Sequence, residues 1–196
     1  MTHAMLPTVE RARRATYADL VAVPEHLVAE IIDGELITSP RPAPPHALAT
    51  SAIGALLFDR FNRPSGPPGA EGGWWILDEP ELHLGEDVLV PDLAGWRRDR
   101  MPRMPEKAWF ELSPDWVCEV ISPSSGRLDR VRKMPIYARE GVPHLWLVDP
   151  ILHTLEVYRL EGARWSVVAA HGGEEAVAAS PFEAGSADLR RWWGEA

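Results

Sequence analysis

Apolar residues recur along the chain with two different spacings, and each spacing predicts a type of secondary structure. Runs of β-forming residues at 27–32 and 35–39 flank Asp33-Gly34. Because that dipeptide readily supplies the positive φ angles of a tight turn, a β-hairpin is predicted there. Over residues 46–61, leucine, isoleucine and phenylalanine recur at helical spacing, which predicts the first long helix.

Two further segments rich in β-forming residues follow this helix. Residues 74–84 are expected to form an irregular strand, and residues 88–96 the next strand. The second segment contains Pro91 and Asp92 near its middle. Because proline cannot donate a hydrogen bond to a sheet, this strand is predicted to be distorted there.

The stretch from residue 115 to residue 150 predicts a strand–helix–strand unit. Residues 116–121 are an apolar strand with one acid, Glu119, in its middle. Residues 126–140 follow as a helix, and residues 144–148 as a second apolar strand. An ionised carboxylate buried alone costs several kcal/mol or more, so Glu119 is expected to have a charged partner or a metal ion.

The order of these elements defines the fold class. Residues 154–160 and 164–170 predict a second hairpin, so the chain reads as mixed β structure with two main helices. This order is typical of the α/β or α+β class. Residues 1–15 are expected to be a loose N-terminal segment, and residues 16–196 a single domain with a core of ordinary size.

The charge of the chain bears on its partners. A net charge of −9 argues against loose, non-specific binding to nucleic acid. Two stretches are locally basic, residues 96–107 and 127–133, and both are expected to flank the candidate site. Trp96 and Trp109 bracket the first stretch, which would suit stacking on nucleic acid. Solvated surface charge is the alternative interpretation of both stretches.

Other features of the composition exclude several classes of protein. Cys118 is the single cysteine, so the chain can form neither an internal disulfide nor a cysteine-based zinc site. The first 15 residues contain no apolar signal-peptide core, and no run of 18 apolar residues exists. A cytoplasmic protein without a membrane span is therefore the expectation.

Three residues form the candidate catalytic site. Asp92 follows a proline in the distorted strand, Glu119 lies inside the next apolar strand, and Lys133 lies on the helix after it. Carboxylates with backbone carbonyls, here of Val120 or Ile121, are hard oxygen ligands suited to Mg²⁺ or Mn²⁺. The lysine could orient or deprotonate a water, or stabilise a developing oxyanion. Metal, activated water and a cation are what phosphodiester hydrolysis requires.

The motifs that carry this site occur in a fixed order. They are Glu30 to Leu36 (EIIDGEL), His46 at the start of a helix, Pro91-Asp92, Glu119 to Ser124 (EVISPS), Asp129 with Lys133 and Tyr137, Gly141 to Pro150 (GVPHLWLVDP), and Glu156 to Tyr158. Together they resemble the Uma-two (Uma2) family of endonucleases, within the PD-(D/E)XK restriction-endonuclease-like superfamily. The resemblance covers roughly residues 16–193.

The resemblance implies a restriction-endonuclease-like central mixed β-sheet flanked by helices, with additional N-terminal and C-terminal hairpins. It implies Asp92 and Glu119 as metal ligands, joined by the backbone carbonyl of Ile121, and a lysine as the third catalytic member. The sequence departs from the superfamily pattern because Ile121 stands where the motif lysine belongs. In this family the lysine is thought to come from the following helix, which points to Lys133. The chain has 18 arginines and only two lysines, Lys107 and Lys133, and a retained lysine is consistent with that role.

Three further residues are candidates for supporting roles. Glu30 could be an outer metal ligand or a member of a structural ion pair. His46 could contact the phosphate, although capping of its helix is the preferred interpretation. Asp129 is interpreted as a first-turn acid that favours the helix dipole, with a supporting role left open. Pro135 is expected to kink this helix or mark a late start, which would weaken the site if it moved Lys133 away from Glu119.

The function expected from these residues is metal-dependent hydrolysis of DNA by an endonuclease. The alternative is a catalytically inactive member that keeps the fold as a nucleic-acid-binding or protein-interaction module. A more distant alternative is a two-carboxylate hydrolase such as a glycosidase, which would act without metal. A homodimer is expected by analogy with restriction enzymes, because duplex DNA has two-fold symmetry and two strands to cut.

Overall fold

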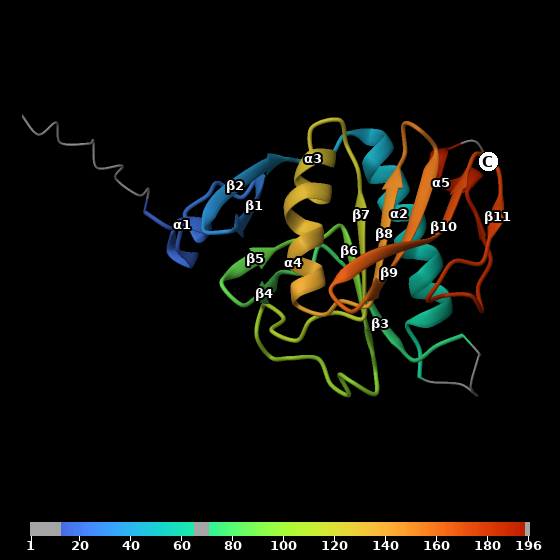
Figure 1. The fold of residues 1–196 in the computed structure, drawn as a ribbon, viewed down its shortest axis with the longest axis horizontal. Coiled ribbons are helices and arrows are strands. Elements are labelled where there is room, and N and C mark those ends of the chain that lie inside the picture. The colour runs from blue at the N-terminus through green and yellow to red at the C-terminus, as the bar shows by residue number, and fades with distance from the viewer. Residues whose placement is uncertain (1–12, 65–70, 195–196) are drawn as a thin grey trace, which may run out of the picture.

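The computed structural model describes residues 13–64 and 71–194, which form three β-sheets with helices packed around the largest (Figure 1). Of the predicted N-terminal segment, residues 1–12 lie outside the described residues. The first helix is α1 (Tyr17–Val21), which Thr16 caps by accepting a hydrogen bond from the Asp19 backbone N–H. Asp19 in turn accepts a hydrogen bond from the Thr16 backbone N–H, so the two residues form a capping box at the start of α1.

The predicted N-terminal hairpin is confirmed. Strands β1 (Leu27–Ile32) and β2 (Glu35–Pro40) pair antiparallel. Asp33 and Gly34 join them with φ values of 54° and 81°, the left-handed conformation that the turn requires. The hairpin belongs to a small sheet of strand order β2-β1-β5-β4, with β4 at Leu82–Leu84 and β5 at Asp87–Leu89.

The central sheet has six strands in the order β10-β9-β8-β7-β6-β3. Their bounds are β3 (Trp74–Asp78), β6 (Leu93–Arg97), β7 (Trp116–Val120), β8 (His144–Asp149), β9 (Thr154–Glu161) and β10 (Arg164–Gly172). Strands β7 and β8 run parallel and the other neighbours antiparallel, so the sheet is mixed, as predicted. The predicted second hairpin is present as β9 and β10, which form one edge of this sheet.

Two predicted strands are each divided between the two sheets, and the distortion predicted at Pro91-Asp92 is confirmed as the point where the second strand is divided. The segment 74–84 is divided into β3 and β4, and the segment 88–96 into β5 and β6. In the second case the chain leaves the small sheet at Val90 and enters the central sheet at Leu93. Pro91 has no N–H with which to continue the strand pairing of β5. The Asp92 side chain accepts a hydrogen bond from the Val120 N–H of β7, so the chain joins the central sheet from this residue onward.

Helices cover both faces of the central sheet, as Figure 1 shows with α4 in front of the strands and α2 behind them. The buried side of α2 (Pro44–Phe61) packs on Trp116, Cys118 and Val120 of β7. The opposite face of β7, with Val117 and Ile121, packs on a helical run that comprises α3 (Gly126–Leu128), the π-helical turn η1 (Asp129–Lys133) and α4 (Met134–Arg139). Cys118 is buried in this core and its thiol is free.

The helical run passes Pro135 without a break, because a π turn precedes the proline. The Met134 N–H donates to the Asp129 carbonyl, one residue further back than in an α-helix. Pro135 then falls in the first turn of α4, where its missing N–H is tolerated. The α-helix α4 begins at Met134, which confirms the late start predicted from Pro135, and both Asp129 and Lys133 face the protein interior.

The C-terminal segment docks on the α2 side of the core. It contains β11 (Ala176–Val177), β12 (Ala187–Asp188) and α5 (Arg190–Trp193), and Leu189 and Trp192 are buried there. Within the described residues, no helix is long and apolar enough to cross a membrane.

Candidate active site

The candidate site lies where β5, β6 and β7 meet the helical run. Asp92 directly precedes β6, and its Oδ2 accepts the Val120 N–H at 2.7 Å. In the β6–β7 register Leu93 pairs with Cys118, which places Asp92 opposite Glu119. The crossover between the two sheets thus brings the two predicted carboxylates to adjoining positions.

Glu119 is buried, with 2% of its surface exposed. Side chains alternate along a strand, so Glu119 faces the helical run together with Val117 and Ile121. Its Oε1 accepts a hydrogen bond from the Tyr137 hydroxyl at 2.6 Å and lies 3.2 Å from the Lys133 Nζ. Both partners come from the helix, four residues apart and therefore on one side of it.

Lys133 is equally buried and is surrounded by acids. Its Nζ lies 2.9 Å from Glu30 Oε1 and 3.9 Å from Asp129 Oδ1. The Val90 carbonyl accepts a further, longer hydrogen bond from it at 3.5 Å. The structure therefore brings Lys133 to Glu119, although thirteen residues and a loop separate them in the chain.

The position of Ile121 explains how a helix can supply this lysine. Ile121 lies on the same face of the sheet as Glu119, in the cluster that packs against α4. A lysine at 121 and a lysine at 133 would thus reach the same region from the strand and from the helix that covers it. This geometry is compatible with a site in which Ile121 replaces the motif lysine and Lys133 reaches Glu119 from the helix.

Glu30 reaches the site from the small sheet. It stands in β1, and its Oε1 accepts the Val90 N–H at 2.8 Å as well as the Lys133 ammonium. Of the two roles considered for it, the structural ion pair is present. The N-terminal hairpin therefore contributes a buried charge to a site that is otherwise built from the central sheet.

His46 does not cap its helix, so that preferred interpretation is wrong. The residue at the N-cap is Ala43, and His46 lies in the first turn of α2 with its Nε2 3.2 Å from Asp92 Oδ1. Burial lowers the pKa of His46, but the hydrogen bond to Asp92 and its charge outweigh burial, and the net shift is upward. His46 thus holds one oxygen of Asp92 while the Val120 N–H holds the other.

Asp129 lies in the first turn of η1, as predicted, but it is buried. Its carboxylate is buried beside Lys133 and forms a side-chain hydrogen bond with Ser125. Burial raises the pKa of Asp129, and the charges of Asp92 and Glu30 raise it further. The position of Asp129 beside Lys133 therefore suits the supporting role that the sequence left open.

Burial dominates the electrostatics of the cluster. It raises the pKa of Glu119 well above the usual carboxyl range, and the charges of Asp129, Asp92 and Glu30 add to this effect against the attraction of Lys133. Burial lowers the pKa of Lys133, but the charges of Glu119, Glu30 and Asp129 outweigh it and raise that pKa well above its ordinary value. The lysine is therefore cationic, and a proton on the carboxylates offsets part of their mutual repulsion.

Asp92 and Glu119 fit a divalent cation by their chemistry and their charge. The cluster contains four carboxylates and two basic groups: Glu30, Asp92, Glu119, Asp129, Lys133 and His46. With all six ionised, the cluster carries a net charge of −2, which a divalent ion would neutralise. Among the described residues no three His, Cys, Asp or Glu side chains form a ready cage, so two carboxylates with backbone oxygens and water are the donor set available.

Tyr137 is the site residue to which sequence reasoning gave no role. It is fully buried, and burial raises the pKa of its hydroxyl well above the ordinary value, so the hydroxyl stays protonated and donates to Glu119. The signal was present in the sequence as the spacing of four residues from Lys133, which puts both side chains on one helix face.

The first basic stretch, residues 96–107, does not flank the site. It follows the far end of β6, about 16 Å along the strand from Asp92. Trp96 is buried, with its Nε1 donating to the Leu112 carbonyl, and Trp109 stacks on His83 with ring centroids 4.9 Å apart. The predicted stacking surface for nucleic acid is therefore wrong for Trp96.

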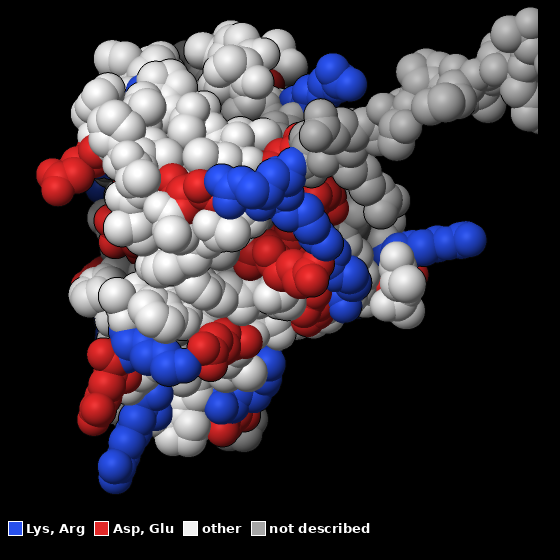
Figure 2. All heavy atoms as spheres, turned by 90° about the vertical axis from the view of Figure 1, so that its left-hand side faces the viewer, with Lys and Arg blue, Asp and Glu red and all other residues white. Residues whose placement is uncertain are grey.

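The second basic stretch, residues 127–133, does lie at the site, because it forms α3 and η1. Its arginines are largely paired: Arg130 with Glu156 at 2.8 Å and Arg132 with Glu35 at 2.6 Å. Figure 2 shows Lys and Arg side chains interleaved with Asp and Glu over the part of the surface that carries the small sheet. This surface offers mixed charge and no broad basic patch.

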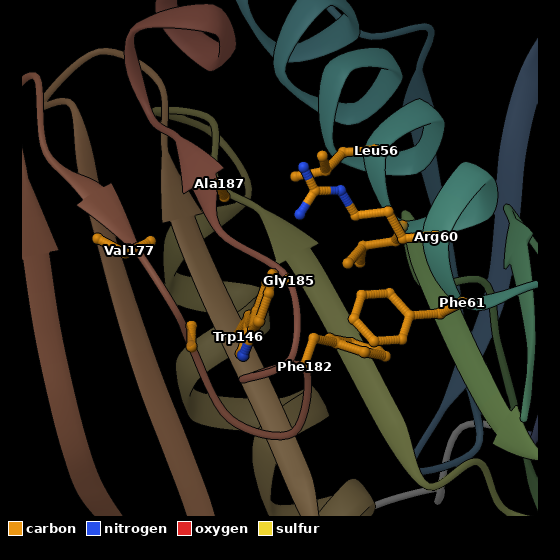
Figure 3. Close-up of a pocket in the computed structure, with 10 residues that line it drawn as sticks. Leu56, Arg60, Phe61, Trp146, Val177, Phe182, Gly185 and Ala187 are labelled. Carbon is orange, nitrogen blue, oxygen red and sulfur yellow. The ribbon is translucent and has the colours of Figure 1, made fainter. Parts of the chain in front are cut away.

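An enclosed cavity lies on the opposite side of the central sheet from Glu119. Figure 3 shows it between α2 and the C-terminal segment, where the rings of Phe61, Trp146 and Phe182 point into it. It encloses only about 10 Å³ and is lined mainly by apolar side chains. It is a packing gap of the core, too small for a ligand and without groups for chemistry.

A mixed sheet with helices on both faces makes this an α+β protein, and the Asp–Glu–Lys cluster lies where that sheet meets the helical run. The chain belongs to the Uma2 family, whose model, described as "Putative restriction endonuclease", matches residues 15–189. A solved structure with the same fold is a crystal structure of "a putative nuclease belonging to DUF820 from Anabaena variabilis ATCC 29413". It has a TM-score of 0.71 and 21% identity, and the match covers 92% of this chain and 98% of that one. No curated protein matches this chain.

Proposed function

We propose that this protein is a metal-dependent endonuclease that hydrolyses phosphodiester bonds in DNA. The observation that carries the proposal is the convergence of Asp92, Glu119 and Lys133 from three separate elements, with Lys133 Nζ 3.2 Å from Glu119. The family and the fold support nuclease chemistry of this kind. If the Lys133–Glu119 ion pair served stability alone, it would not require Asp92 opposite Glu119 on the neighbouring strand.

Asp92, Glu119 and the Ile121 carbonyl would hold Mg²⁺ or Mn²⁺ at the end of β7. When bound, such an ion polarises a phosphoryl oxygen and lowers the pKa of a coordinated water. Lys133 is kept protonated by its acidic neighbours, so it donates hydrogen bonds and cannot accept the proton of the attacking water. We therefore assign to Lys133 the stabilisation of negative charge on the phosphate and the orientation of water.

Three side chains fix the geometry of these groups. His46 holds Asp92, Tyr137 holds Glu119, and Glu30 holds Lys133. We assign them positioning roles, because each contacts a proposed catalytic side chain through a hydrogen bond or an ion pair. A homodimer is part of the proposal, because a single site cuts one strand of a duplex. Light scattering of the purified protein tests that part independently of activity.

The test of the nuclease is cleavage of supercoiled plasmid in Mg²⁺ or in Mn²⁺, with an EDTA control. We expect nicking by wild type and no nicking with EDTA or by Glu119→Ala. Glu111→Ala, which removes an exposed carboxylate elsewhere, is the matched control and should cut like wild type. Metal-independent cleavage, or cleavage retained in Glu119→Ala, would contradict the proposal.

A second candidate is a catalytically inactive nuclease-fold module that binds nucleic acid or protein. One observation favours it: Lys133 Nζ is closer to Glu30, at 2.9 Å, than to Glu119, at 3.2 Å. A lysine held mainly by Glu30 would serve the stability of the crossover between the two sheets. Absence of both cleavage and Mn²⁺ binding in the wild type would support this candidate over the nuclease.

A further inference from the structure

A surface groove lies between α2 and the edge strand β3 and encloses about 380 Å³. This volume is in the range of sites that bind small organic groups. The groove has an apolar floor and a rim of hydroxyl groups, an aromatic ring and a carboxylate. Its lining includes Thr50, Ser51, Gly54, Phe58, Ile76 and Asp78.

The groove adjoins the candidate active site on both of its walls. On the strand side, Asp78 pairs with Leu93, the residue after Asp92, and the Glu79 N–H donates to the Asp92 carbonyl at 3.1 Å. On the helix side, the Thr50 hydroxyl donates to the carbonyl of His46 at 3.0 Å. The His46 ring contacts the Asp92 carboxylate, so both walls of the groove continue to the segment around Asp92.

Charge determines which part of a nucleic acid can enter. Among the described residues that line the groove, Asp78 is the one charged group, and none is Lys or Arg. A phosphate would be repelled by this carboxylate, whereas an uncharged base would not. Phe58, which is 55% exposed, offers a ring face on which a base can stack.

Asp78 also selects among the bases. Asp78 is exposed at the end of β3, and no hydrogen bond or ion pair joins its carboxylate to another described residue, so both oxygens are available as acceptors. Guanine is the base that presents two neighbouring N–H donors on its Watson–Crick edge. A carboxylate accepts such a pair of donors in a two-bond arrangement, whereas thymine offers one donor between two carbonyls.

We propose that this groove binds one unstacked base of the nucleic-acid substrate next to the bond that is cut, with guanine preferred. The inference rests on the proposed nuclease function and adds a base-recognition site to it. Phe58 would supply affinity through stacking and Asp78 would supply the preference. Taking the base out of its stack favours single-stranded or locally opened substrate.

The test measures binding without cleavage, by fluorescence anisotropy of short oligothymidines in EDTA. The central base is G, A, C or T, and the protein is wild type, Phe58→Ala or Asp78→Asn. We expect the G oligonucleotide to bind most tightly, Phe58→Ala to weaken all of them about tenfold, and Asp78→Asn to remove the preference for G. Val167→Ala, which truncates an exposed apolar residue on β10 at the other edge of the central sheet, is the matched control and should bind like wild type.

Equal affinities for the four oligonucleotides, or unchanged binding by Phe58→Ala, would overturn the inference. The same samples assayed with plasmid and Mn²⁺ separate it from the nuclease proposal. Cleavage by wild type with no effect of Phe58 or Asp78 on binding rejects the groove alone. G-preferring binding without cleavage rejects the nuclease alone. Conversion of a dimer to a monomer by Phe58→Ala, with unchanged DNA affinity, would make the groove a contact between two copies and would also overturn the inference.

Discussion

The two faces of strand β7 have opposite character. Trp116, Cys118 and Val120 face α2 and lie in an apolar core that is rich in tryptophan and phenylalanine. On the other face, Glu119 is surrounded by Lys133 and further buried polar groups from β1 and the helical run. One strand of five residues thus separates an apolar core from the charged cluster that forms the proposed site.

The contrast between the apolar and the charged face of β7 indicates how a small domain can accommodate buried charge. The α2 face gains free energy from apolar surface removed from water, at about 25 cal/mol per Å². The other face places like charges together, which destabilises the fold unless a proton or a metal ion compensates them. Substitutions on the two faces should therefore separate stability from activity.

The largest separation is expected between Trp146→Ala and Glu119→Gln. Trp146 packs edge-on against Trp116 on the α2 face, with ring centroids 5.1 Å apart, and its truncation should cost about 3–5 kcal/mol in the free energy of unfolding. Glu119→Gln should lower the rate of plasmid cleavage by at least about 100-fold while the protein stays folded. Urea unfolding and cleavage rates of both variants make the comparison. Loss of stability without loss of activity in Glu119→Gln would reverse the assignment of the two faces.

A smaller effect is expected from Tyr137→Phe, which removes only the hydroxyl that holds Glu119. We expect about a tenfold loss in cleavage rate, because a hydrogen bond to a charged group is worth about 1.5–3 kcal/mol. A positioning role predicts that the loss varies with the concentration of Mn²⁺, since a misplaced carboxylate binds the ion more weakly. Tyr158→Phe, which removes a hydroxyl bonded to Glu156 outside the site, is the control. An equal loss in both variants, with no change in the Mn²⁺ dependence, would argue against positioning.

The smallest effect concerns pH and follows from the raised pKa values of Glu119 and Asp129, whose first cause is burial. The folded protein holds protons that the unfolded chain releases, so this contribution is fully present below the ordinary carboxyl pKa. It is lost as the pH rises through the raised values. Metal-free wild type should therefore lose stability from acidic toward neutral pH, and Glu119→Gln should lose less. Urea titrations across this range check it, and equal slopes for the two proteins would refute the coupling.

Local chemistry explains which parts of the fold the sequence predicted. The hairpin at Asp33-Gly34 depends on two residues that adopt positive φ, and the long helix depends on periodicity within α2. Both signals lie within the element itself. The division of segment 88–96 between two sheets was not predictable in this way, because it depends on which distant strand pairs with each half.

In the candidate site, too, contacts between residues far apart in the chain were not predictable from local sequence patterns. Asp92, Glu119 and Lys133 were found from an acid in an apolar strand and from motif order, and the structure brings them together. The contact of His46 with Asp92 joins residues 46 positions apart, so no local pattern encodes it. The burial of Asp129 depends on the π turn before Pro135, which helical periodicity does not reveal.

The most direct test of the central claim is Mn²⁺ binding measured by isothermal titration calorimetry in two buffers with different heats of protonation. We expect one site in wild type that releases protons on binding, because the raised pKa of Glu119 must be overcome. Asp92→Asn and Glu119→Gln should each abolish binding, and Asp115→Asn, which alters a buried carboxylate elsewhere, should not. No binding to wild type, or equal binding to all four proteins, would contradict a metal site built on Asp92 and Glu119.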